Sequence, residues 1–282
     1  AYIGGLGAGL VSLWLAPSLP ALLVLPLAVL GAALFGAAWG FIPGYLQAKR
    51  GSHIVITTIM FNFIAASVMV WLLAGALIEP GQMSPQTPKF APSGQLPSFQ
   101  SVLAGLGLNI AESPLNLSFV IALIALVCFW VLVWRTRLGY EIRTVGQNPD
   151  AAHYAGINVP RIIIIALAIS GGLAGLMATN EVLGVQHRVV LNFTAGYGFT
   201  GIAVALMGRN HPVGIFLASL LFGALYQGGA ELDFEFQSIT REMVLLIQGM
   251  IILFSGALAY MFNPPLAQFI AAVMRKREAV NV

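Results

Sequence analysis

A polar, basic segment at residues 135–161 interrupts an otherwise strongly apolar chain. It carries four of the 13 lysines and arginines of the whole sequence, namely Arg135, Arg137, Arg143 and Arg161. An apolar run flanks it on each side, at residues 115–134 and 162–183. About 20 apolar residues in a helix suffice to cross the hydrocarbon core of a bilayer. Because basic loops remain on the cytoplasmic side, we expect residues 135–161 to form a structured cytoplasmic loop between two spans.

Composition excludes the soluble class of proteins. The 282 residues are 59% hydrophobic and only 8% charged, whereas soluble domains are about one quarter charged. A soluble fold of this length could not cover its surface with so few charges. We therefore predict an all-α fold, a polytopic transmembrane helical bundle. The net charge of +3 gives no indication of nucleic-acid binding, and the single cysteine, Cys128, excludes a disulfide framework within the chain.

Apolar runs recur along the chain, and many are rich in glycine and alanine, which let helices approach closely in lipid. The predicted spans are residues 2–16, 21–45, 54–77, 115–134, 162–183, 213–227 and 244–262. The run at 198–207 is too short to cross the membrane. It predicts either a broken or re-entrant helix, or a tilted helix extended by residues 193–197. The chain opens inside an apolar run, and we expect one or more spans to be missing upstream.

The basic residues also predict how the chain is divided and oriented. The loop at 135–161 and a basic tail at 264–282 are expected in the cytoplasm, and segments 79–114 and 228–237 outside. Residues 1–263 then form one transmembrane domain. Prolines disfavour a long helix in the outer loop 79–114. That loop is either a surface linker or a cap over an entrance that docks a soluble partner.

A short internal similarity indicates a duplication. The tetrapeptide LFGA occurs at residues 34–37 and again at 221–224, each time in an apolar helix that follows a proline-marked turn. Inverted repeats are common in transporters. The predicted bundle therefore allows an inverted repeat.

Uncharged polar residues within the spans indicate a solute pathway. Thr58 and Asn62 are four residues apart and share one face of a helix. Amides and hydroxyls suit a neutral, hydroxyl-bearing solute, because they donate and accept hydrogen bonds without a buried charge. The alternative for Asn62 is a hydrogen bond between helices. The candidate pathway residues are Thr58, Asn62, Ser170, Phe199, Thr200 and Gln227.

The cytoplasmic loop contains a strong signal for a short helix. Asn148 is a good N-cap, Pro149 a good first residue, and Asp150 favours the positive end of the helix dipole. Gly156 suits the helix end. The small residues that follow Asp150 offer a close-packing surface made of Ala151, Ala152, Tyr154 and Ala155. From these residues alone, a capped loop helix without a partner is an equally good interpretation.

Motifs for chemistry are absent from the sequence. It has no GxxxxGK[ST] phosphate loop, so the chain is not expected to hydrolyse ATP by itself. The four histidines are dispersed in predicted loops, and no metal site or other cofactor is expected in this chain. The lack of a mid-membrane Asp/Arg pair argues against an ion-coupled carrier. Missing paired carboxylates argue against a membrane-embedded enzyme.

Three stretches carry a resemblance to a known family. Residues 138–152, LGYEIRTVGQNPDAA, followed by AGI at 155–157, resemble the LGxxxRAxGxNxxAAxxxGI pattern of permease subunits of bacterial ABC importers for ribose-like sugars, branched-chain amino acids and nucleosides. Thr144 stands where that family often has alanine. Residues 54–62, IVITTIMFN, are similar to the EVIxTIMLN stretch of the nucleoside-type subgroup. Residues 201–214, GIAVALMGRNHPVG, resemble GIAVALLGxxxPxG.

The resemblance implies partners and a location. Two permease chains, as a homodimer or heterodimer, would form the pathway in the bacterial inner membrane. Two cytoplasmic ATPases would hold ATP and Mg²⁺, and an outer substrate-binding protein would deliver the solute. A short coupling helix in the cytoplasmic loop would fit a groove on the ATPase. The implied coupling residues are Arg143, Gly146, Asn148, Pro149, Asp150, Ala151, Ala152 and Gly156.

The resemblance also implies the function. Residues 1–263 would be a permease domain and not an enzyme, and the implied solute is a nucleoside. Simple sugars such as ribose or a galactofuranose-like sugar are the alternative within the family. An ion-coupled secondary carrier is the alternative from another class.

Overall fold

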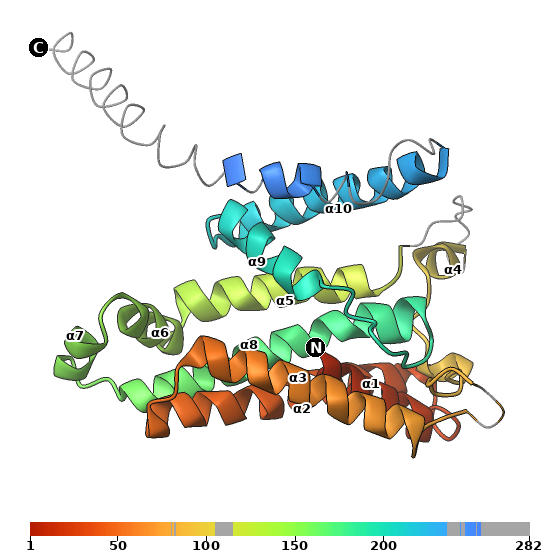
Figure 1. The fold of residues 1–282 in the computed structure, drawn as a ribbon, viewed down its shortest axis with the longest axis horizontal. Coiled ribbons are helices and arrows are strands. Elements are labelled where there is room, and N and C mark those ends of the chain that lie inside the picture. Colours follow the sequence, from red (N-terminus) through yellow and green to blue (C-terminus); the bar gives the residue numbers. More distant parts are fainter. Residues whose placement is uncertain are drawn as a thin grey trace, which may run out of the picture. The chain divides into compact units, whose positions relative to one another are not determined.

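Helices build most of the described chain in the computed structural model (Figure 1). The structure describes residues 1–79, 81, 83–104, 115–235, 243, 246–251 and 253–254. Within these residues, β pairing is limited to two isolated bridges, between Gln86 and Val190 and between Ser98 and Asn116. The prediction of an all-α fold is therefore confirmed. The chain divides into two compact units, Ala1–Ala195 and Gly196–Val282, which are described separately.

The first unit holds most of the helices. Its elements are α1 (Tyr2–Leu15), α2 (Ala21–Arg50), α3 (Ile54–Ala74), the 3-10 turn η1 (Pro92–Gly94), α4 (Phe99–Ala104), α5 (Ser118–Trp130), the π segment η2 (Val131–Arg135), α6 (Arg137–Gln147), α7 (Pro149–Tyr154), α8 (Val159–Thr179) and the π segment η3 (Asn180–Val185). The second unit contains α9 (Tyr197–Met207) and α10 (Pro212–Glu235).

Within the described residues, five helical stretches are long and apolar enough to cross a membrane. They are Ala21–Arg50, Ile54–Ala74, Ser118–Arg135, Val159–Val185 and Pro212–Leu232. These stretches confirm the multi-pass class of membrane protein. Of the remaining predictions, the span at 244–262 is described only in part, and the basic tail at 264–282 lies outside the described residues.

One predicted boundary is wrong. We expected an outer loop to begin at residue 228, but α10 continues to Glu235. Glycines at 228 and 229 are tolerated within this helix. A side-chain hydrogen bond of 3.2 Å, which the Gln227 amide donates to Glu231 one turn later, spans the two glycines and supports the helix there.

Small residues let the helices of the first unit touch through their backbones. Gly36 of α2 lies against Gly171 of α8, so that a Cβ on either glycine would meet the carbonyl oxygen of the other. Gly4 of α1 packs where α2 and α8 meet, beside Gly175 and the carbonyl of Ala32. Figure 1 shows α1, α2 and α8 lying together. The expectation that these glycines serve helix packing is confirmed.

The described part of segment 79–114, predicted to be the outer loop, is packed onto the helices of the first unit. The backbone N–H of Leu96 donates to the carbonyl of Leu183 at 2.9 Å, and that of Thr87 donates to Val189 at 3.1 Å. Phe90 and Leu96 are buried in the same apolar cluster as Leu183 and Val189. The described part of this segment is therefore not a free linker. Whether it docks a soluble partner stays a prediction.

Helix α9 is short. It begins at Tyr197, directly after Gly196 in the left-handed conformation with φ 77°, so residues 193–196 do not extend it. Its 11 residues span about 16 Å, roughly half of a hydrocarbon core. This length agrees with the broken-helix alternative.

Both units also share an order of elements, namely a short helix, a turn and a long helix. The inverted repeat itself stays a prediction.

Candidate functional site

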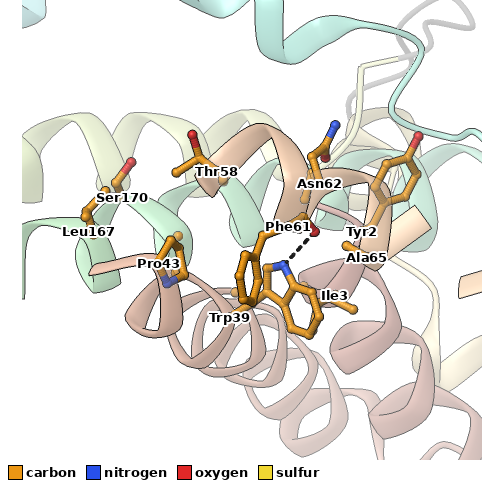
Figure 2. Close-up of a pocket in the computed structure, with 16 residues that line it drawn as sticks. Tyr2, Ile3, Trp39, Pro43, Thr58, Phe61, Asn62, Ala65, Leu167 and Ser170 are labelled. Carbon is orange, nitrogen blue, oxygen red and sulfur yellow. Dashed lines mark hydrogen bonds between the residues drawn. The ribbon is translucent and has the colours of Figure 1, made fainter. Parts of the chain in front are cut away.

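A pocket of about 180 Å³ lies among α1, α2, α3 and α8, within the first unit. Three of the predicted pathway residues, Thr58, Asn62 and Ser170, line it together, and Figure 2 shows them on neighbouring helices. The lining residues are Ala1, Tyr2, Ile3, Gly4, Gly36, Trp39, Gly40, Pro43, Thr58, Phe61, Asn62, Ala65, Leu167, Ser170, Gly171 and Ala174. The structure thus brings Ser170 together with Thr58 and Asn62, which precede it by 112 and 108 residues in the sequence.

The polar side chains at this pocket differ in whether they already form hydrogen bonds within the chain. The Thr58 hydroxyl lies 2.9 Å from the carbonyl oxygen of Ile54, to which it donates, so it faces a solute chiefly as an acceptor. Asn62 is exposed, and its amide has no hydrogen-bond partner in the part of the chain that the structure describes. The hydrogen bond between helices that we considered for Asn62 therefore has no partner there. Its donors and acceptor remain available to a solute.

Aromatic side chains form another part of the lining. The indole Nε1 of Trp39 donates a hydrogen bond of 3.3 Å to the carbonyl oxygen of Phe61. The two rings meet edge to face, with centroids 5.6 Å apart. The hydroxyl of Tyr2 donates to Asn192 at 3.3 Å. Sequence reasoning missed all three aromatic residues. The available signal was that Phe61 directly precedes Asn62.

The other three predicted pathway residues belong to the second unit. Phe199 and Thr200 lie on α9, where the Phe199 side chain is 79% exposed. Gln227 lies on α10 and is bonded to Glu231. Within this unit the rings of Tyr197 and Tyr226 join α9 to α10 at a centroid distance of 6.1 Å. Their place in the solute pathway stays a prediction.

The short helix predicted in the cytoplasmic loop is present as α7. The Asn148 side chain accepts hydrogen bonds from the backbone N–H groups of Asp150 at 2.9 Å and Ala151 at 3.0 Å, as an N-cap does. Pro149 is the first helical residue. Gly156 follows the helix with φ 79°, a conformation that favours glycine. The predicted helix boundaries are confirmed at both ends.

Sequence reasoning missed the second helix of this loop. α6 precedes α7, and its N-cap is Thr136, whose hydroxyl oxygen accepts a hydrogen bond of 3.1 Å from the backbone N–H of Gly139. Figure 1 shows α6 and α7 together near one end of α8. The signal was available, because Thr136 precedes an amphipathic stretch.

The structure corrects the role expected for Ala152. Its side chain is fully buried against Val145 of α6 and Ile162 of α8. Ala152 therefore holds the loop together and is not available to a partner. The other predicted coupling residues are exposed, namely Arg143, Gly146, Asn148, Pro149, Asp150, Ala151 and Gly156. Tyr154, whose side chain is 92% exposed, lies on the same short helix.

Substituting the N-cap tests the local account of α7. We expect Asn148→Ala to weaken the helix by about 1 kcal/mol, because two backbone N–H groups lose their acceptor. Asn148→Asp should retain the cap, and Gln147→Ala serves as an exposed neighbouring control. Hydrogen–deuterium exchange of peptides covering residues 148–157 measures the effect. Equal exchange in Asn148→Ala and the unaltered protein would contradict the account.

Comparison with known proteins places the chain in a family. Residues 3–256 match the family model described as "Branched-chain amino acid transport system / permease component". The chain is 38% identical to a nucleoside ABC transporter permease protein of Lactococcus lactis, covering 86% of this chain and 67% of the relative. It is 38% identical to a guanosine ABC transporter permease protein of Bacillus subtilis, covering 83% and 65%.

A further relative has a different solute in its name. The chain is 34% identical to a glucose ABC transporter permease protein of Haloferax volcanii, covering 84% of this chain and 62% of the relative. The chain thus spans about two thirds of the lengths of these relatives. No solved structure gives a significant match. With five membrane-length helices among its described residues and a family match over residues 3–256, the chain is a multi-pass membrane protein that belongs to the branched-chain amino acid transport system permease component family.

Proposed function

We propose that this chain is the membrane-spanning permease subunit of an ATP-driven importer for nucleosides. The observation that carries the proposal is the pocket in which the uncharged side chains of Thr58, Asn62 and Ser170 lie beside the rings of Trp39 and Phe61. A nucleoside combines hydroxyl groups with a flat aromatic base. Hydroxyls and amides suit the first, and aromatic edges and faces suit the second. The names of the 38% identical relatives support the same solute class.

Energy for transport is proposed to come from separate cytoplasmic ATPase subunits that bind ATP and Mg²⁺. The exposed surface of α6 and α7 would contact them, and an outer binding protein would deliver the solute to a pair of permease chains. The sequence itself carries no phosphate-binding loop. The capped, exposed helix α7 with its small side chain at Ala151 supports a close contact with another protein.

Two alternatives are weaker. Simple sugars are supported by the 34% identical glucose permease relative and by a ribose import permease protein of Escherichia coli at 29% identity. An ion-coupled carrier would call for a pair of opposite charges within the spans. In the described part of the chain, the ion pairs are Arg137 with Glu141 and Arg188 with Glu79, and both lie outside the five membrane-length stretches.

Uptake of radiolabelled nucleoside tests the proposal. Cells carrying the complete operon should accumulate label, and excess unlabelled nucleosides should compete better than ribose or glucose. Replacing Asn62 by leucine, which has a similar size, should lower uptake about tenfold. A polar group of the nucleoside would then give up its hydrogen bonds to water without gaining one in the pocket. Ser67→Ala is the matched control, since the Ser67 hydroxyl is exposed on the same helix and bonds to its own helix at Phe63.

The outcomes separate the solute classes. Competition by sugars but not by nucleosides would move the assignment to a sugar permease. Full uptake in Asn62→Leu would remove this residue from the pathway.

A further inference from the structure

Trp39 joins two helices at the level of the pocket. It extends from α2, and its indole N–H donates to the carbonyl oxygen of Phe61 in the middle of α3. The edge-to-face contact of the two rings, at an interplanar angle of 64°, adds a second link. Figure 2 shows this hydrogen bond beside the pocket, with Asn62 next to Phe61 along the helix. Both aromatic residues line the pocket.

The first half of α3 has few other attachments. The buried side chains of α3 are Ala65, Met69 and Leu73, and all three lie in its second half. None of the residues from Ile54 to Ile64 is buried within the described chain. A turn at residues 51–53 connects this half to the end of α2, and the contact with Trp39 holds it further along. Thr58 and Asn62 lie in this weakly held half.

We propose that Trp39 is a positioning residue, which holds the first half of α3 so that Thr58 and Asn62 stay opposite Ser170 across the pocket. The inference rests on the proposed pathway, because it assigns to Trp39 the geometry of that same site. Trp39 acts through α3 and needs no contact with the solute. Among apolar side chains only tryptophan combines a large ring with an N–H donor, so phenylalanine at this position keeps the ring contact and loses the hydrogen bond.

Distance measurements test the positioning role without any solute. In a background in which Cys128 is replaced by serine, spin labels at Phe41 of α2 and Ile59 of α3 report on the first half of α3. Labels at Leu30 and Val70 report on the second half. These four side chains are exposed, so labelling disturbs little packing.

The expected result is local. Trp39→Phe should broaden the distance distribution between labels 41 and 59, Trp39→Ala should broaden it more, and neither should change the distance between labels 30 and 70. Trp71→Phe is the matched control, since Trp71 lies on α3, the helix that carries labels 59 and 70, with a side chain that is 72% exposed. Trp39→Phe preserves most of the packing volume, so this variant keeps the test valid if Trp39→Ala fails to fold. Unchanged 41–59 distances in both Trp39 variants would overturn the proposal.

Transport activity provides a second test of the positioning role. In Trp39→Phe the maximal rate of nucleoside uptake should fall about threefold to tenfold, the factor corresponding to loss of one hydrogen bond between membrane helices. The half-saturating concentration should stay unchanged, because the outer binding protein sets it. Altered distances with an unaltered uptake rate would also overturn the positioning role. If the unaltered protein transports no nucleoside, the proposed function fails, and the distances still decide whether Trp39 holds α3.

Discussion

Replacing Gly36 by leucine is expected to remove most of the folded protein from the membrane. A Cβ at this position would lie 3.1 Å from the Cα of Gly175 and closer still to the carbonyl oxygen of Gly171. The neighbouring atoms belong to the backbone of α8, so no side chain can rotate away. Overpacking costs about 1–3 kcal/mol where side chains can adjust, and we expect the upper end of that range or more here. Because the free energy of unfolding of a folded protein is small, a loss of this size removes a large fraction of it.

Ala38→Leu is the matched control for this substitution. Ala38 lies two residues further along α2, and its side chain is exposed, so leucine there adds apolar surface without meeting α8. The amount of monodisperse protein after detergent extraction, and its thermal unfolding midpoint, measure both variants. Gly36→Leu should lose most of its yield, while Ala38→Leu should behave as the unaltered protein. Equal yields for the two variants would show that α2 and α8 do not touch through Gly36.

Replacing Ala151 by tryptophan is expected to abolish uptake while the loop stays folded. Ala151 is exposed on α7, where a large ring has room in the isolated chain. On the proposed contact with the ATPase, the same ring would hold the two proteins apart. Losing a hot-spot contact at the centre of an interface costs about 2 kcal/mol or more, and we expect uptake to fall more than tenfold. Asp150→Arg should act similarly, with an added local cost because it places a cation at the N-terminus of α7.

Ala152→Trp separates docking from folding. Ala152 is fully buried between α6 and α8, so tryptophan there should disorder the loop itself. Hydrogen–deuterium exchange across residues 137–157 should therefore rise in Ala152→Trp and stay normal in Ala151→Trp. Co-purification of the ATPase should be lost in both. An Ala151→Trp protein that retains the ATPase and full uptake would exclude α7 as the coupling surface.

The sequence predicted those features that depend on local composition. The spans of α2, α3 and α8 follow from long apolar runs, and α7 follows from the Asn148-Pro149 pair and from Gly156. These signals are local because helix length and capping depend on neighbouring residues. Helix α10 exceeded its predicted end because glycine is a weak stop signal inside an otherwise helical stretch.

Features that depend on how a helix is rotated were not predictable. The membrane helices are apolar on all sides, so periodicity does not show which face meets a neighbour. The contact of Trp39 with Phe61 and the burial of Ala152 are both of this kind. Ala152 is buried because Val145 and Ile162, on two other helices, converge on it. The grouping of Thr58 and Asn62 with Ser170 likewise depends on the close approach of α2 and α8. The glycines in the sequence show that such an approach is possible, but they do not show which residues of the two helices face each other.

ATP dependence of transport tests the central claim most directly. The complete transporter would be reconstituted into liposomes with its ATPase subunits and outer binding protein, and uptake of radiolabelled nucleoside would be measured with and without ATP. We predict uptake that requires ATP hydrolysis, is insensitive to collapse of the proton and sodium gradients, and is lost in Ala151→Trp. Uptake that follows an ion gradient in the absence of ATP would contradict the account and identify the chain as a secondary carrier.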